Sequence, residues 1–190
     1  MKIPINTPMT NPQPTKSSAT SPPSGGLGGA ELFLVASQYC TFIENIASFS
    51  QEDILDYLLK ITPLLYLKAN LIVDFELEDN AAGEQYVTEE EYELYYLRIK
   101  EKLGDIEFFE GFSIEENEVI SYSLCEILTD AYQDLKDFLL LYSKNTLLAQ
   151  ENAVWLCRNN FVRNWGRKMV AVLPYLHFLN YGVEEEEEFD

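Results

Sequence analysis

Four acidic residues lie at helical spacing in the middle of the chain and form its most regular group of chemically active side chains. They are Glu126, Asp130, Asp134 and Asp137, and separations of four, four and three residues place them along one helix face. Carboxylates stacked in this way could hold a metal ion, exchange protons with a small molecule, or pair with basic side chains from a neighbouring helix. We favour the last interpretation, a structural network of ion pairs.

Arg158 is the predicted counter-charge for this stripe. It lies in the middle of an apolar helix face, and a guanidinium group cannot be buried without a partner. Its planar shape suits a carboxylate, which it can bind through two nitrogens. Because the connection between the two helices is short, they should pack antiparallel, with Arg158 level with Tyr132. We therefore expect a largely buried Arg158 paired with Asp130 or Asp134.

The last helix carries two further residues of interest. Trp165 is expected in the core, whereas a surface position would make it a platform for a ligand. His177 is the only histidine and lies at the edge of the apolar face, where we expect a hydrogen-bonded boundary residue.

Sequence motifs of known catalytic sites are missing. One histidine cannot complete a Cys/His zinc site of ordinary spacing, nor the Glu-x-x-His pairs of ferritin-like di-metal proteins. The sequence has no phosphate-binding GK[ST] loop, no G-x-S-x-G turn and no HExxH motif. We therefore assign no catalytic residue, no metal site and no cofactor, and the sequence leans against an enzyme without deciding the question.

The charge of the chain restricts its partners. It has 190 residues, with 13 Lys and Arg against 32 Asp and Glu, which gives a net charge of −19. Such a charge repels phosphate backbones and anionic lipid, so we expect no nucleic-acid binding and no membrane binding. No apolar run approaches the roughly 18 residues that cross a bilayer. A protein partner remains possible.

The three cysteines, Cys40, Cys125 and Cys157, are odd in number and far apart in sequence. Free, buried thiols in a reducing cytoplasm are the expected state.

The sequence predicts mainly helices between residues 31 and 103. A helix is expected over 31–48, and Ser50 should cap a second helix that Pro63 breaks or kinks. Within residues 71–87, apolar and acidic side chains alternate over 73–78 as in a strand, but no convincing partner strand is present, so we favour an extended acidic loop. Thr88 and Glu91 form a capping box for a helix through Leu103.

The second half is predicted to hold two long helices. Ser113 and Glu116 form a second capping box, which should open a helix that ends near Lys144. The last helix should run from 146 to 181 with a kink over 170–173, because Pro174 lies inside it. Three phenylalanines lie in the connector before Ser113, and their side chains are expected to pack into the core. They are Phe108, Phe109 and Phe112.

The predicted fold is an all-α antiparallel bundle of five to six helices over residues 30–183. Residues 1–29 are rich in Pro, Gly and Ser, too poor in apolar side chains to form a core, and are predicted to be a disordered tail rather than a secretory signal. Residues 184–190 carry five consecutive glutamates and should form an acidic, solvated tail.

The stretch SLCEILTDAYQDLKDF over residues 123–138 resembles the central motif of a bacterial family known only as a domain of unknown function. Asn164 to Gly166, Leu173 and the Leu176–His177 pair resemble its C-terminal motif. The resemblance spans roughly 30–182 and implies an all-helical cytosolic domain without an assigned activity. The signature positions that it implies are Glu126, Asp130, Tyr132, Asp134, Trp165, Gly166 and His177. With Arg158 in place of Gly166, this set gives our candidate binding residues.

Three functions fit these observations. The leading hypothesis is a non-enzymatic acidic helical module that binds or interacts with a partner. The second is a metal-assisted or small-molecule enzyme that uses Glu126, Asp130 and Asp134. The third is an acidic inhibitor or mimic that engages a basic protein surface, as the net charge of −19 allows. Bound metal would separate the second from the others, and salt-dependent capture of a partner would separate the third from the first.

Overall fold

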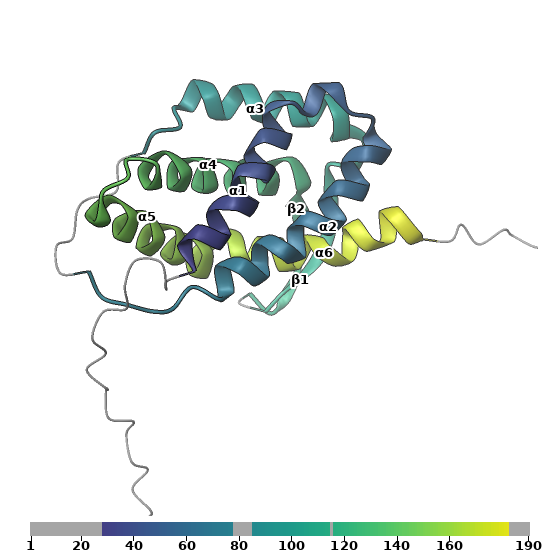
Figure 1. The fold of residues 1–190 in the computed structure, drawn as a ribbon. Coiled ribbons are helices and arrows are strands. Elements are labelled where there is room, and N and C mark those ends of the chain that lie inside the picture. The colour runs from purple at the N-terminus through teal and green to yellow at the C-terminus, as the bar shows by residue number, and fades with distance from the viewer. Residues whose placement is uncertain (1–27, 78–84, 115, 183–190) are drawn as a thin grey trace, which may run out of the picture.

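The chain forms helices α1 to α6, with one β-hairpin between α3 and α4, in a computed structural model that describes residues 28–77, 85–114 and 116–182 (Figure 1). The helices are α1 (Gly29–Glu44), α2 (Gln51–Asn70), α3 (Glu89–Leu103), α4 (Leu124–Tyr142), α5 (Leu147–Asn160) and α6 (Gly166–Tyr181). The hairpin strands are β1 (Phe108–Ser113) and β2 (Glu118–Ser123). The predicted all-α class is confirmed. The predicted tails lie outside the described residues, except that Gly29 already belongs to α1.

Helix α4 lies at the centre of the fold. It packs against α1, α3 and α5, while α2 packs against α6, and Figure 1 shows α1 crossing in front of α4 with α5 beside it. One face of α4 is buried from end to end and includes Leu128, Leu135 and Phe138. The acidic residues lie beside this face, so the helices that flank α4 determine which partners they meet.

Two of the predicted helix starts are confirmed. The Ser50 hydroxyl accepts the backbone N–H of Asp53 at 3.1 Å and caps α2. Thr88 and Glu91 form the predicted capping box at the start of α3. In both cases a side-chain oxygen satisfies a backbone donor that the first helical turn leaves free.

Pro63 does not end α2, which runs without a break from Gln51 to Asn70. Of the predicted break or kink, the break is therefore wrong. Its neighbours Ile61 and Leu65 are buried on the core side, and burial of such side chains offsets the roughly 3 kcal/mol that an interior proline costs. Beyond α2, residues 73–77 have no regular secondary structure, in agreement with the predicted loop for the part that the structure describes.

The helix predicted to begin at Ser113 is wrong, because this region is the hairpin. The Ser113 hydroxyl does accept the backbone N–H of Glu116 at 3.3 Å, but in the turn between β1 and β2. Asn117 completes the turn with a left-handed backbone, at φ 54°. A serine three residues before a glutamate makes the same local bond in a turn and at a helix start, so the motif alone does not separate the two. Helix α4 begins eleven residues later, at Leu124.

The last helix is interrupted at a different place from the one predicted. A π-helical turn over Phe161–Trp165 joins α5 to α6, whereas Pro174 lies within α6. Gly166 explains the position of the turn, because a Cβ atom there would lie 2.5 Å from the Phe161 carbonyl oxygen and 2.6 Å from its ring. Phe161 thus folds over a residue without a side chain, and the register of everything after it shifts.

The three cysteines are free and buried, as predicted. Within the described residues, none of the helices combines the length and the apolarity that a membrane crossing requires.

Candidate functional site on helix α4

The acidic stripe of α4 begins at a well-defined helix start. The Ser123 hydroxyl accepts the backbone N–H of Glu126 at 3.2 Å and caps α4. Glu126 itself is exposed, whereas Asp130, Asp134 and Asp137 are partly buried. The four acids therefore share a helix face, as predicted, but not an environment.

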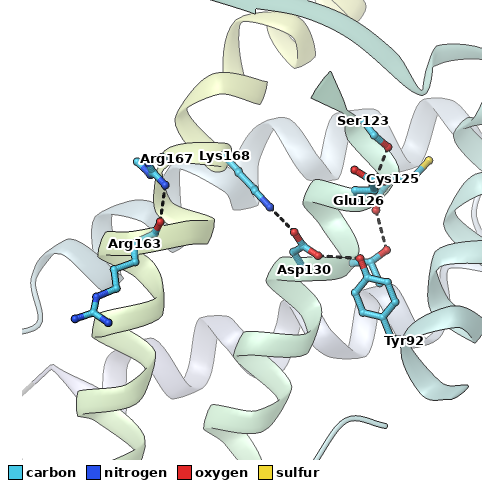
Figure 2. Close-up of polar contacts among 9 residues, drawn as sticks. Tyr92, Ser123, Cys125, Glu126, Asp130, Arg163, Arg167 and Lys168 are labelled. Carbon is cyan, nitrogen blue, oxygen red and sulfur yellow. Dashed lines mark hydrogen bonds and ion pairs between the residues drawn. The ribbon is translucent and has the colours of Figure 1, made fainter. Parts of the chain in front are cut away.

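Asp130 binds two side chains that come from different helices, as Figure 2 shows. The Tyr92 hydroxyl of α3 donates to one oxygen at 2.8 Å, and the Lys168 ammonium group of α6 pairs with the other at 2.5 Å. Burial and the hydrogen bond to Asp130 both raise the pKa of Tyr92 well above its usual value. Tyr92 thus stays protonated and keeps donating, and Asp130 ties α3, α4 and α6 together.

Asp134 is the acid with the most unusual environment. The Asn160 amide of α5 donates to its Oδ1 at 2.7 Å, while its buried Oδ2 has no hydrogen-bond partner among the described residues. Burial raises the pKa of the carboxyl to about 6, and the charges of Asp130 and Asp137 act in the same direction. Asp134 therefore exchanges its proton near neutral pH, where an exposed aspartate is fully ionised.

A small cavity of about 110 Å³ opens beside Asp134, between α4 and α5. Its lining mixes polar and apolar side chains, from Gln85, Asp134, Asp137, Phe138, Leu141, Ala153, Leu156, Cys157 and Asn160. Asp137 accepts the backbone N–H groups of Tyr86 and Val87, both at 2.9 Å, which fixes the end of the preceding loop on α4. Burial raises the pKa of Cys157, so its thiol is held in the unreactive protonated form.

The predicted pairing of Arg158 with this stripe is wrong. Its guanidinium Nη1 lies 3.2 Å from Asp74 Oδ1, and its Nε donates to the Ile72 carbonyl at 3.3 Å. Arg158 thus holds the loop that follows α2. The residues of α5 and α6 that bind the stripe are Asn160 and Lys168 instead. Lys168 lies beyond the π-helical turn, which displaces it from the position that an uninterrupted helix gives it.

Tyr132 and Trp165 are core residues. The Tyr132 hydroxyl donates to Glu44 Oε1 at 3.2 Å, and Lys136, one turn further on, pairs with the same carboxylate. Trp165 is fully buried against Phe161, and its indole N–H has no hydrogen-bond partner in the described part of the chain. A ligand could reach either ring only if the bundle opened.

His177 is exposed, with its ring at the edge of Tyr181. The structure does not bring it to the acidic stripe. Sequence reasoning also missed Glu44 and Lys136, which join α1 to α4. One feature of the sequence could have indicated this contact. Tyr132 and Lys136 are four residues apart, which puts a hydroxyl and an ammonium group on one helix face, where both can bind the same carboxylate.

The contacts of the acids on α4 are suited to holding the helices together rather than to catalysis or metal binding. Three of the four acids accept hydrogen bonds or ion pairs from α3, α5, α6 or the preceding loop. Among the described residues, no three His, Cys, Asp or Glu side chains come close enough together to hold a metal ion. Asp134 alone combines a cavity, an unpartnered oxygen and a pKa near neutrality.

Comparison with known proteins agrees with the resemblance seen in the sequence. The model of a family described as "Domain of unknown function (DUF5063)" matches residues 30–182. The chain belongs to this family. Residues 30–182 of this DUF5063 protein include the acidic stripe, the hairpin and the π-helical turn, so the family domain contains the whole candidate site.

A solved structure shares the fold of this DUF5063 domain. The crystal structure of protein BF1032 from Bacteroides fragilis, a Northeast Structural Genomics Consortium target, is similar with a TM-score of 0.73. The two sequences are 30% identical over 83% of this chain and 95% of that one. No curated protein matches the sequence.

Proposed function

We propose that this DUF5063 chain is a non-enzymatic, acidic helical module that binds a protein partner. The observation that carries the proposal is a set of apolar side chains that stand uncovered among carboxylates. On α3, Leu94 is 44% and Leu97 53% exposed, and exposed glutamates lie on both sides of them. We define the α3 outer face as Glu93, Leu94, Leu97 and Glu101.

The hairpin carries a second surface of the same kind. We define the hairpin outer face as Phe108, Glu110, Phe112, Val119 and Ser121, all of which are exposed. Single exposed apolar residues are ordinary, but grouped ones rimmed by charge are typical of protein interfaces. The negative charge of the chain favours a partner with a basic surface and would speed their encounter.

The acids of α4 also support a non-enzymatic module, because they argue against a catalytic role. They are used to hold the helices together, so the groups most suited to catalysis already have structural partners. The buried thiols favour a cytoplasmic module, since such thiols persist in a reducing compartment.

Affinity capture with a matched pair of variants tests the proposal. The surface variant combines Leu94→Ser, Leu97→Ser and Phe112→Thr. The control variant combines Leu147→Ser and Leu148→Ser, two equally exposed leucines at the start of α5. We expect wild type and control to enrich the same partner and the surface variant to lose it. The proposal is wrong if no protein is enriched, or if both variants lose it equally.

Salt distinguishes the module from the acidic mimic of a basic-surface partner. A mimic binds through charge, so raised salt should release its partner while the surface variant still binds. An interaction anchored by Leu94, Leu97 or Phe112 should survive raised salt and fail in the surface variant.

A small-molecule enzyme is the second candidate, and the cavity beside Asp134 favours it. A carboxyl whose pKa lies near neutrality can accept or give up a proton during a reaction. Glu126 and Asp130 do not line this cavity, so the candidate rests on Asp134 alone. Elemental analysis of the purified chain, together with turnover assays of wild type and Asp134→Asn, tests it. Activity that is lost in the variant, while its free energy of unfolding is not lowered, would favour the enzyme.

A further inference from the structure

The two faces of the hairpin differ in what covers them. On the inner face, Phe109 stacks on Tyr122 at 5.3 Å and on Tyr175 of α6 at 4.7 Å between ring centroids. The Tyr122 ring also fills the space above Gly111, where a Cβ would lie 2.9 Å from it. On the outer face, Phe108 is 66%, Phe112 60% and Val119 62% exposed. Only one phenylalanine of the three therefore plugs the core, in contrast to the prediction.

Among the described residues, no further strand pairs with the outer edge of β1 or β2. In the described residues the sheet consists of β1 and β2 alone, and Figure 1 shows the hairpin reaching past α2 at the lower edge of the view. An unpaired strand offers backbone donors and acceptors to an added strand, and natural proteins usually block such edges with charge or cover them. Open edges beside an apolar face are the feature that strand addition uses.

The charge around the hairpin selects the partner. Between Lys102 and Lys136 the sequence has no Lys or Arg, while Glu110, Glu116 and Glu118 are all exposed on the hairpin. Glu110 stands between Phe108 and Phe112 on the outer face. A second copy that pairs its β1 antiparallel with this β1 about Glu110 would set two carboxylates against each other, and like charges facing each other across strands are destabilising. A basic side chain in that position is favourable instead.

The register gives the order of side chains that would fit. Cross-strand pairs place Phe108 in a row with Ser123, Glu110 with Ser121, and Phe112 with Val119. A strand added beside β1 continues these rows, and its residues at every second position face the same side. We propose that the hairpin outer face binds an extended segment of a protein partner with the order apolar–x–basic–x–apolar, in which the basic residue faces Glu110. This inference rests on the proposed function and specifies its partner.

Three short peptides serve as probes, with the cores Val-Thr-Lys-Thr-Val, Val-Thr-Glu-Thr-Val and the scrambled Lys-Thr-Val-Val-Thr. Titration into the isotope-labelled full chain, followed through backbone amide signals, gives both the affinity and the location of binding. We expect the first peptide to move signals of residues 108–123 and to bind about tenfold more tightly than the other two.

Charge reversal makes the test specific. Glu110→Lys should invert the preference, so that the Glu peptide binds about tenfold more tightly than the Lys peptide. Glu52→Lys on α2, an exposed position outside both defined faces, changes the net charge by the same amount and should keep the wild-type preference. Phe112→Thr retains a strand-forming residue and should weaken binding of the Lys peptide about tenfold. Contacts between Phe109 and Tyr175 in each variant report whether the hairpin is still folded.

Several results would overturn this inference. A Glu110→Lys chain without inverted preference would show that the row of Glu110 does not select the partner. Peptide binding that maps to the α3 outer face would reject the hairpin and leave the proposed function standing. Concentration-dependent dimers held through residues 108–119 would identify a second copy as the occupant. If no peptide binds and affinity capture also finds no partner, both proposals fail.

Discussion

The folded chain disfavours ionisation of the Asp134 carboxyl group relative to the unfolded chain. Its folded pKa is about 6, above the ordinary value of 3.8, so ionisation costs the folded state more than the unfolded one. The penalty is absent below about pH 4, grows as pH rises, and is complete above about pH 6. We predict that Asp134→Asn raises the free energy of unfolding by about 2 kcal/mol at neutral pH and leaves it unchanged in acid. Urea denaturation at both pH values measures this, with exposed Glu93→Gln as the control. An Asp134→Asn chain no more stable than wild type at neutral pH would contradict it.

Lys168 has the role that the sequence suggested for Arg158, since it is the basic residue that pairs with the acidic stripe. Asp74, the partner of Arg158, is 81% exposed on its side chain, and exposed ion pairs contribute little. Lys168 faces a partly buried Asp130 that would keep only Tyr92 if the lysine were lost. We predict a loss of about 0–1 kcal/mol for Arg158→Met and about 1–2 kcal/mol for Lys168→Met. Double-mutant cycles with Asp74→Asn and Asp130→Asn measure each coupling. A larger coupling for Arg158 would reverse our assignment.

The π-helical turn between α5 and α6 was not predicted from the sequence at all. Alanine normally favours a helix over glycine by about 1 kcal/mol, but a Cβ at Gly166 would lie 2.5 Å from the Phe161 carbonyl oxygen. We predict that Gly166→Ala lowers the free energy of unfolding by about 1–3 kcal/mol. Gly104 has φ −63°, and a Cβ added there would lie 3.7 Å from its nearest neighbour atom, so Gly104→Ala should be neutral or stabilising. Chemical denaturation of both variants measures the difference, and equal effects of the two substitutions would show that crowding does not set the turn.

Local hydrogen bonds explain which elements were predictable. Ser50 and Thr88 precede runs with helical periodicity, so cap and pattern agree and the helix starts were predicted correctly. Ser113 makes the same kind of bond before a β-strand in which only Ile120 and Tyr122 alternate with serines, so the cap motif alone led to the helix prediction. The π-helical turn depends on Phe161 folding over Gly166, a contact between side chain and backbone that no periodicity records. An error of this size shifts every partner beyond it, which is why Lys168 was missed.

At the scale of the whole molecule, composition was sufficient for the fold class and for the burial of the thiols. The spacing of the acids was sufficient to place them on one face of α4, because helical periodicity alone determines that. It did not determine their partners, since α3, α5 and α6 meet α4 through tertiary packing that a single sequence does not encode in any local pattern. The net charge of −19 belongs to this scale as well, and it acts on stability through repulsion across the entire surface.

The two ends of the chain should affect stability in different ways. Residues 1–27 contain six prolines and no acidic residue, and such a composition buries little apolar surface. Their removal spares Gly28, whose carbonyl accepts the N–H of Leu32 at the start of α1, so we predict a nearly unchanged midpoint of thermal unfolding.

Removal of residues 184–190 takes away six acids from a strongly negative protein and should raise the midpoint at low salt, because less repulsion remains. Added salt screens that repulsion, so the gain should fade as salt increases. Calorimetry of the full chain and both truncated chains at two salt concentrations checks this. A midpoint lowered by many degrees on removal of residues 1–27 would show instead that this segment docks on the helices.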